Sequence, residues 1–313
     1  MVKTARPAER RTVLRPHPSS GPLPTFVVIG AMKAGTTSLF HYLEAHPQIS
    51  MPAVKETDFF VEELNWSRGV DWYRRQFRGA GGDVRAIGEA SPAYTKYPMY
   101  GGVPDRMASV IPDARLIYLV RDPIERIRSH YEHCVLVGTE TAPIEEAVLR
   151  DPRYLDCSRY ALQVSRFLHH FPSEQLLIVR SEDLRERRVE TLREIYRFLD
   201  VDDGVMPATV DREYYRTDDR ENYPGYVWWL RRNVKRIVPQ GKRWRARRWL
   251  SLALERASGT SRRLRHTSDQ ASPHARVEIS PELRARLIDE LRDDIDEFRR
   301  HAPDRFDGWG LAS

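Results

Sequence analysis

The chain has 313 residues, of which 41% are hydrophobic, and its formal net charge is +6. This length allows one large domain or two small ones, and the modest positive charge suits anionic ligands of any size without by itself indicating nucleic acid. No apolar run approaches the roughly 18–20 residues of a membrane span, and the N-terminus lacks the apolar core of a secretory signal. Two cysteines are too few for a disulfide framework. We therefore expect a cytoplasmic protein with reduced thiols.

The N-terminal part of the chain changes character near residue 25. Residues 1–24 carry arginine, proline and serine without an apolar period, and we expect a disordered tail there. The run 25–29 is apolar and β-branched, which predicts a buried strand. Thr36 or Thr37 is expected to cap a helix that follows through residues 38–43.

Strand and helix patterns then alternate along the chain. The segment 61–84 has a helical and then a loop-like pattern. Strands are predicted at 87–89, 116–120 and 176–179, and helices at 123–136, 160–168, 184–199 and, as a long amphipathic helix, after residue 280. This alternation predicts an α/β fold with a largely parallel central sheet that is covered by helices on both faces.

The stretch 216–270 differs in kind from the rest, because tryptophans alternate with many arginines and lysines at 228–249. Three interpretations stay open for this helical insertion: a lid over the acceptor, a helix in peripheral contact with a membrane surface, and a solvated charged face. Aromatic and basic residues together also occur in proteins that bind single-stranded nucleic acid, but a single run is thin support and we expect no nucleic-acid partner.

The segment 30–38, GAMKAGTTS, directly follows the first predicted strand. Its two glycines have the spacing of a Walker A phosphate loop, but Thr36 occupies the position of the Walker lysine, and Lys33 lies inside the loop. A nucleoside triphosphate needs that lysine on its phosphates and a hydroxyl on Mg²⁺. The displaced lysine therefore favours an anion other than a metal-bound triphosphate, with simple turn glycines as the alternative interpretation.

A second candidate phosphate site follows the clearest strand. Arg121 stands at the carboxyl end of the run 116–120, where ligands of open α/β sheets bind, and Ser129 lies on the helix that follows. An arginine can grip a phosphate with two parallel hydrogen bonds, and a hydroxyl can add a third. The alternative is a structural ion pair between Arg121 and Asp122.

These motifs resemble those of a family. The segment 30–38 is similar to the 5′-phosphosulfate loop of sulfotransferases that use 3′-phosphoadenosine 5′-phosphosulfate (PAPS), and 121–129, RDPIERIRS, is similar to their 3′-phosphate motif. The segment 55–60, KETDFF, resembles a K-E-x-x-F-F stretch of the heparan sulfate sulfotransferase-like and bacterial branches, and Tyr160 fits the same branch. The resemblance covers the chain from about residue 25 to 200 and resumes in the C-terminal helix.

The resemblance implies a single sulfotransferase domain over 25–313, with a P-loop-like sheet and a divergent 216–270. It also implies transfer of a sulfuryl group from PAPS to a hydroxyl or amine of a small molecule, glycan or lipid, which releases adenosine 3′,5′-bisphosphate (PAP). Such a reaction depends on positioning and electrostatics, and we expect no metal requirement. The alternatives are a P-loop nucleotide kinase or phosphotransferase, which Thr36 disfavours, and a non-catalytic PAPS- or anion-binding module, which Lys33 and Glu56 disfavour.

The resemblance also implies roles for individual residues. Lys33 would stabilise the leaving phosphate oxygen, and Glu56 would be the general base, with Asp58, Glu62 and Glu63 as nearby alternatives. The co-substrate would be held by Lys33, Ala34, Gly35, Thr36, Thr37, Ser38, Arg121, Ser129 and Tyr160. Two departures separate the chain from heparan-type relatives: Ala90 stands where they often have a lysine, and no Lys-Gly-Arg loop precedes the C-terminal helix.

Overall fold

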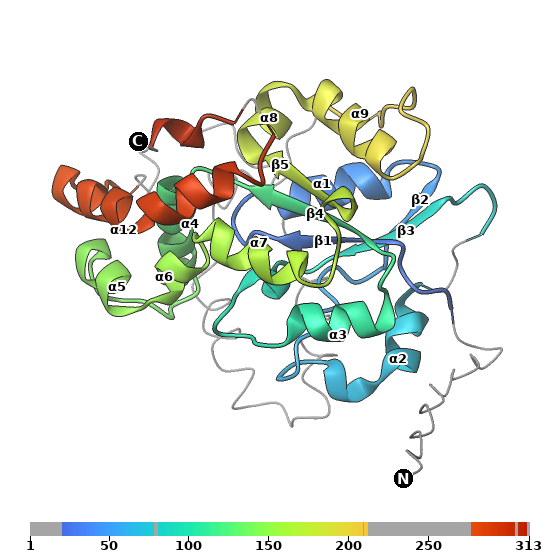
Figure 1. The fold of residues 1–313 in the computed structure, drawn as a ribbon, viewed down its shortest axis with the longest axis horizontal. Helices are drawn as coiled ribbons and strands as arrows, with labels where there is room; N and C mark the ends of the chain where they lie inside the picture. The colour runs from blue at the N-terminus through green and yellow to red at the C-terminus, as the bar shows by residue number, and fades with distance from the viewer. Residues whose placement is uncertain (1–20, 78–80, 209, 212–276, 304–305, 312–313) are drawn as a thin grey trace, which may run out of the picture.

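The computed structural model describes residues 21–77, 81–208, 210–211, 277–303 and 306–311. Within these residues a single parallel sheet has the strand order β2-β3-β1-β4-β5 (Figure 1). The strands are β1 (Phe26–Gly30), β2 (Ile49–Ser50), β3 (Ala86–Ala90), β4 (Arg115–Val120) and β5 (Leu176–Arg180). Every residue of β1 is buried, as expected for a central strand of a parallel sheet with both faces covered.

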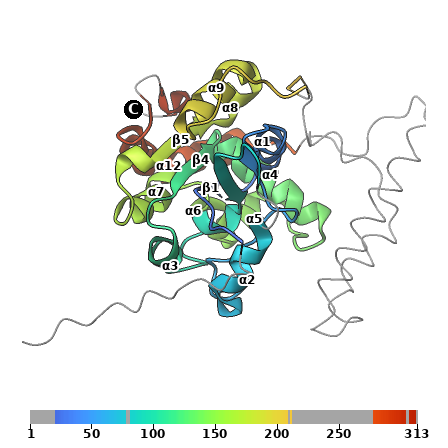
Figure 2. The same ribbon diagram turned by 90° about the vertical axis from the view of Figure 1, so that its right-hand side faces the viewer.

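Helices cover both faces of this sheet, as Figures 1 and 2 show from two directions. The described helices are α1 (Thr36–Glu44), α2 (Val70–Arg74), α3 (Val103–Val110), α4 (Pro123–Leu136), α5 (Ile144–Arg150), α6 (Arg153–Asp156), α7 (Tyr160–Leu168), α8 (Ser181–Glu186), α9 (Arg188–Phe198) and α12 (Pro281–Arg299). Helices α1 and α9 lie together on one side, and α3 and α7 lie on the other. The predicted α/β class and parallel sheet are confirmed.

The register of the sheet brings three strand ends together. Val28 of β1 lies beside Ala90 of β3 and beside Ile117 of β4. Because all strands are parallel, the segments that leave the carboxyl ends of β1, β3 and β4 meet at one edge of the sheet. The phosphate loop, Ser91 and Arg121 all begin at this edge.

Local sequence signals set the start of α4 but not that of α1. Pro123 is the first residue of α4, and the carboxylate of Asp122 caps this helix by accepting the N–H groups of Ile124 (2.8 Å) and Glu125 (3.0 Å). The predicted cap of α1 was wrong: Gly35 occupies the cap position in a left-handed conformation, Thr36 is already helical, and no side chain caps the helix. The loop therefore uses glycine freedom where a hydroxyl cap was expected.

The C-terminal helix α12 packs its apolar face as the pattern predicted. Its buried residues are Leu283, Leu287, Leu291, Ile295 and Phe298. Asp294 on the same helix accepts the N–H groups of Ala161 (3.0 Å) and Leu162 (2.9 Å), so α12 also caps the first turn of α7. Two distant parts of the chain are thereby joined beside β4.

No helix among the described residues is long and apolar enough to cross a bilayer. The predicted tail, apart from residues 21–24, and the whole Trp/Arg-rich stretch 216–270 lie outside the described residues. Cys134 and Cys157 are both free thiols, Cys157 buried and Cys134 partly exposed.

Candidate functional site

The phosphate loop joins the end of β1 to the start of α1. Two of its residues adopt left-handed backbone, Lys33 with φ 73° and Gly35 with φ 95°. The first turn of α1 has neither a side-chain cap nor an acidic residue. Its leading N–H groups and the positive end of the helix dipole are thus left to an anion, which fits the 5′-phosphate of the proposed co-substrate.

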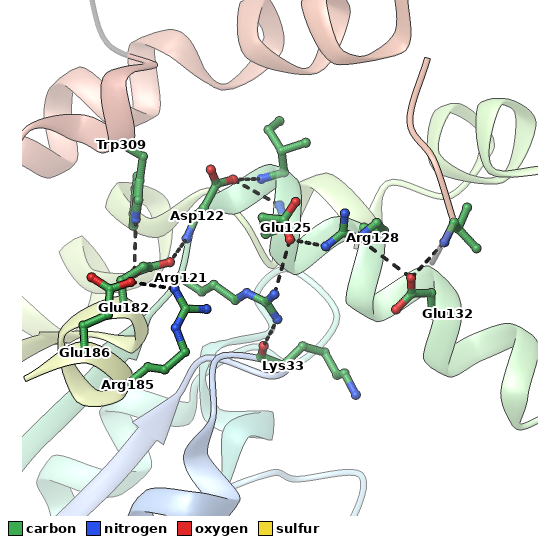
Figure 3. Close-up of polar contacts among 12 residues, drawn as sticks. Lys33, Arg121, Asp122, Glu125, Arg128, Glu132, Glu182, Arg185, Glu186 and Trp309 are labelled. Atoms are coloured by element: carbon green, nitrogen blue, oxygen red, sulfur yellow. Dashed lines mark hydrogen bonds and ion pairs between the residues drawn. The ribbon is translucent and has the colours of Figure 1, made fainter. Parts of the chain in front are cut away.

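The predicted loop residues differ in how far they are exposed. Ala34 and Thr36 are buried, whereas Gly35 is exposed and Lys33, Thr37 and Ser38 are partly exposed. The side chain of Lys33 extends away from the arginine on the neighbouring strand end (Figure 3). The loop therefore presents backbone amides and one long cation rather than a row of hydroxyls.

Gly30 is the point where the loop leaves the sheet, and it has no room for a side chain. A Cβ there would collide with Thr95 Oγ1 and would lie 3.1 Å from Thr95 Cβ and 3.2 Å from Tyr118 Cε2. Thr95 Oγ1 itself donates a hydrogen bond to the Ile29 carbonyl (3.1 Å). The segment after β3 is thus packed directly onto the base of the phosphate loop.

Arg121 lies across the gap between the phosphate loop and α4 (Figure 3). Its guanidinium donates to the Lys33 carbonyl (3.4 Å) and to Glu125 Oε2 (3.4 Å). Glu125 also pairs with Arg128, whose Nε lies 3.8 Å from Glu132. The candidate phosphate arginine is therefore positioned by a chain of alternating charges along α4, and its own contacts are long enough to be exchanged for a phosphate.

The structure places Tyr160 against the backbone of this arginine, whereas Ser129 lies eight residues along the chain from it. Ser129 is buried on α4. Tyr160, at the start of α7, donates its hydroxyl to the Arg121 carbonyl (2.7 Å) and packs its ring against Trp309 and Phe298. Tyr160 thus supports the backbone that carries Arg121, which the sequence did not reveal.

Glu182 is a residue near the site that the sequence analysis did not assign. Its carboxylate accepts the backbone N–H of Asp122 (3.0 Å) and the indole N–H of Trp309 (3.4 Å), as Figure 3 shows. It links the start of α4 to the C-terminal segment. Its partner Asp122 lies 60 residues away in the chain, so no local sequence pattern reveals this contact.

The predicted base Glu56 lies in a turn at the same edge of the sheet. Its side chain is half exposed and pairs with Lys55 (2.5 Å). Its neighbour Asp58 is partly buried, and its backbone N–H donates to Ser91 Oγ (3.1 Å) directly after β3. Burial, together with the nearby carboxylates of Glu56 and Glu89, raises the pKa of Asp58 to about 6.

Behind this turn lies a wholly buried carboxylate, Glu89 of β3. It accepts hydrogen bonds from four hydroxyl groups: those of Thr57, Tyr73 (2.6 Å), Ser91 (2.8 Å) and Tyr94 (2.8 Å). Burial raises the pKa of Glu89, and these four donors counteract the rise. A buried charge that is so fully hydrogen-bonded serves to fix the segments around it.

His130 is a buried residue of α4. Burial and the neighbouring cations Arg126 and Lys96 lower the pKa of His130 to about 2, so the ring is neutral at physiological pH. In the part of the chain that the structure describes, no group of three or more His, Cys, Asp or Glu side chains is arranged to hold a metal ion.

A model of the sulfotransferase domain family matches residues 23–223. The chain belongs to the sulfotransferase domain family. A solved sulfotransferase from Alicyclobacillus acidocaldarius is 30% identical, with a TM-score of 0.55 over 69% of this chain and 94% of that chain. The predicted resemblance is confirmed, and the segments 30–38 and 121–129 that carried it both begin at the sheet edge described above.

Two curated relatives give the range of similarity. Membrane-associated sulfotransferase kil1 of Dictyostelium discoideum is 37% identical over 127 residues, which are 39% of this chain and 26% of the relative. Bifunctional heparan sulfate N-deacetylase/N-sulfotransferase 3 of Homo sapiens is 33% identical over 208 residues, which are 59% of this chain and 23% of the relative. The chain thus spans about a quarter of the length of these curated relatives.

Proposed function

We propose that this protein transfers the sulfuryl group of PAPS to an acceptor hydroxyl or amine and releases PAP. The observation that carries the proposal is the convergence of an uncapped helix start at Gly35 with the guanidinium of Arg121, whose Nη1 lies 3.4 Å from the Lys33 carbonyl. Two anion sites on adjacent strand ends match a nucleotide with phosphates on both its 5′ and 3′ sides. Membership of the sulfotransferase family supports the same ligand.

Each group of residues at the site has its own role in the proposed reaction. The segment 35–38 holds the 5′-phosphate, since the Ala34 N–H already donates to the Ala31 carbonyl (3.1 Å). Lys33 places its ammonium where negative charge gathers on the leaving oxygen. Arg121 and Ser129 hold the 3′-phosphate. A carboxylate of the turn over residues 56–58 takes the proton of the attacking group; the family motif matches Glu56 to this role.

The acceptor is proposed as a small molecule, a glycan or a lipid that carries a hydroxyl or amine. Purified protein is incubated with PAPS labelled in its sulfuryl group and a panel that includes 4-nitrophenol, glucosamine oligosaccharides and a long-chain alcohol. Transfer is read by mass spectrometry of the acceptor and by release of PAP. Turnover of Mg-ATP without any response to PAPS would instead indicate a phosphotransferase.

Lys33→Ala tests the role of the loop cation, because loss of one preorganised donor to developing charge costs on the order of 100–1,000-fold in kcat. We expect such a loss, while the Kd for PAP, measured by calorimetry, changes by less than about tenfold. Arg85→Ala is the matched control, since Arg85 is an exposed cation just before β3, at the opposite edge of the sheet. Wild-type turnover by Lys33→Ala contradicts the assignment.

A further inference from the structure

Glu89 of β3 is wholly buried, and hydroxyl groups fill its acceptor sites. Its Oε1 accepts the hydroxyls of Tyr73 (2.6 Å) and Tyr94 (2.8 Å). Its Oε2 accepts the hydroxyls of Thr57 and Ser91 (2.8 Å). An ionised carboxylate offers about four lone-pair sites and no proton, so it takes all of these donors at once. Each hydroxyl therefore directs its single proton to Glu89.

Two of these hydroxyls also hold the backbone of the neighbouring turn. The oxygen of a hydroxyl remains an acceptor after its proton has been donated. Ser91 Oγ accepts the N–H of Asp58 (3.1 Å), and the Tyr94 hydroxyl accepts the N–H of Phe59 (3.0 Å). The negative charge of Glu89 thus sets the direction of two relays, each of which runs from a backbone amide through a hydroxyl to the carboxylate.

The turn over residues 56–58 carries Glu56, which the family motif matches to the general base. Glu56 has φ 65° and Asp58 has φ 46°, in the left-handed region that residues other than glycine rarely adopt. Such a backbone persists only where its surroundings determine it. Asp58 is held by its amide, whereas its carboxylate Oδ1 is buried without a hydrogen-bond partner among the described residues. The relays to Glu89 therefore supply a constraint that the turn needs.

The buried segment 91–95 joins this turn to the phosphate loop. Its serine and tyrosine hold the turn, and Thr95 at its end donates to the Ile29 carbonyl (3.1 Å) and lies against Gly30, where the loop begins. The carboxylate of the base and the loop for the 5′-phosphate are thus attached to one short segment. The rate of a transfer between bound groups depends on their mutual position.

We propose that Glu89 is a positioning residue of the transfer reaction: its carboxylate orients the hydroxyls of the segment 91–95, and these hold the turn so that Glu56 reaches the proton of the acceptor. The inference rests on the proposed function. Because Glu89 is wholly buried, it contacts neither the co-substrate nor the acceptor. It acts on the rate of transfer, and the binding of PAP is left to the phosphate loop and Arg121.

Glu89→Gln is the direct test, because glutamine keeps the shape of the side chain but replaces one acceptor oxygen by an NH2 donor. Each carboxylate oxygen takes one relay hydroxyl, Tyr94 on Oε1 and Ser91 on Oε2, so either orientation of the amide disrupts one relay. A misplacement of about 1 Å can cost on the order of 100-fold in rate. We expect kcat to fall by about 100-fold, while the Kd for PAP stays within about threefold of the wild-type value.

Two tyrosines provide a matched pair of variants. Tyr73 and Tyr94 are both buried and both donate to Glu89 Oε1. The Tyr94 hydroxyl also accepts an amide of the turn, whereas the Tyr73 hydroxyl has no other hydrogen bond among the described residues. We expect Tyr94→Phe to lower kcat by about tenfold or more and Tyr73→Phe to change it by less than about threefold. Both variants lose a buried hydrogen bond and should melt at a lower temperature.

The kcat is measured with saturating PAPS and the best acceptor of the panel. It is expressed per PAP-binding site, determined by calorimetry, so that unfolded protein does not count. The proposal is overturned if Glu89→Gln keeps a kcat within about threefold of wild type, or if its PAP affinity falls as far as its kcat. The second result would indicate a role in stability of the whole site.

If Glu89→Gln does not fold, the tyrosine pair decides, because a lower kcat in Tyr94→Phe than in Tyr73→Phe supports the relay and an equal kcat contradicts it. Failure of the inference is distinguishable from failure of the proposed function. An active wild-type protein with an unaffected Glu89→Gln variant refutes the inference alone. A wild-type protein that binds PAP but transfers nothing to any acceptor refutes the proposed function, and the inference with it.

Discussion

Gly30→Ala tests whether the junction of β1 and the phosphate loop is as closed as the structure indicates. The added methyl would meet Thr95 Oγ1 well inside van der Waals contact, with Tyr118 Cε2 at 3.2 Å on another side. Thr95 and Tyr118 are at most 1% exposed, so neither side chain can turn out into solvent. The threonine hydroxyl must rotate away and give up its hydrogen bond to the Ile29 carbonyl.

The cost follows from these two changes. Overpacking of a well-packed core typically costs about 1–3 kcal/mol, and a lost buried hydrogen bond adds roughly 1 kcal/mol. We therefore expect Gly30→Ala to lower the free energy of unfolding by about 2–4 kcal/mol, which corresponds to a fall in Tm of roughly 5–10 °C. Because the loop begins at this residue, PAP affinity should also fall, by about tenfold or more.

Thermal melting and calorimetric titration with PAP measure the two effects separately. Gly88→Ala is the matched control, because its Cβ would collide with the ring of Phe26 in the middle of the sheet, away from the loop. That variant should lose stability but keep its PAP affinity. Thr95→Ala in the Gly30→Ala background should recover part of the stability. A Gly30→Ala protein with wild-type Tm and PAP affinity would refute the reasoning.

Two further predictions concern residues that support the site. Tyr160→Phe removes the hydroxyl that donates to the Arg121 carbonyl (2.7 Å), and we expect PAP affinity to fall about 5–10-fold, the equivalent of roughly 1 kcal/mol, in calorimetric titration; unchanged affinity would show that the hydroxyl does not position Arg121. Asp294→Ala removes both acceptors at the start of α7 and should cost about 1–2 kcal/mol in urea unfolding. Asp293→Ala is the control, because Asp293 is the exposed neighbour of Asp294. Equal stability of the two variants would argue against a capping role.

The sequence by itself determined the elements and the two phosphate motifs. The strand β4 followed from a continuous apolar run, the five buried positions of α12 followed from a period of 3.6 residues, and Pro123 marked the start of α4. The glycines of the loop and its displaced lysine indicated an anion site and its family. These signals are local, so they can be read without knowledge of what lies beside them.

Prediction from local sequence failed where two backbone conformations fit the same residues equally well. A threonine cap and a left-handed glycine both start a helix after the loop, and the structure uses Gly35. For the general base, the sequence likewise left several neighbouring carboxylates as candidates, because the spacing of residues does not reveal which side chains are buried. The raised pKa of Asp58 and the exposed pairing of Glu56 with Lys55 arise from which segments lie against the turn.

Tertiary structure alone decided how the site is built. The crossovers of a parallel sheet bring Ser91, Gly30 and Arg121 to one edge, although they are separated in the chain by other strands and helices. The partners of Arg121, the four hydroxyls on Glu89 and the orphaned oxygen of Asp58 depend on that juxtaposition. Burial and Coulomb interactions act through space, and the order of residues along a chain specifies them only once strand order and register are set.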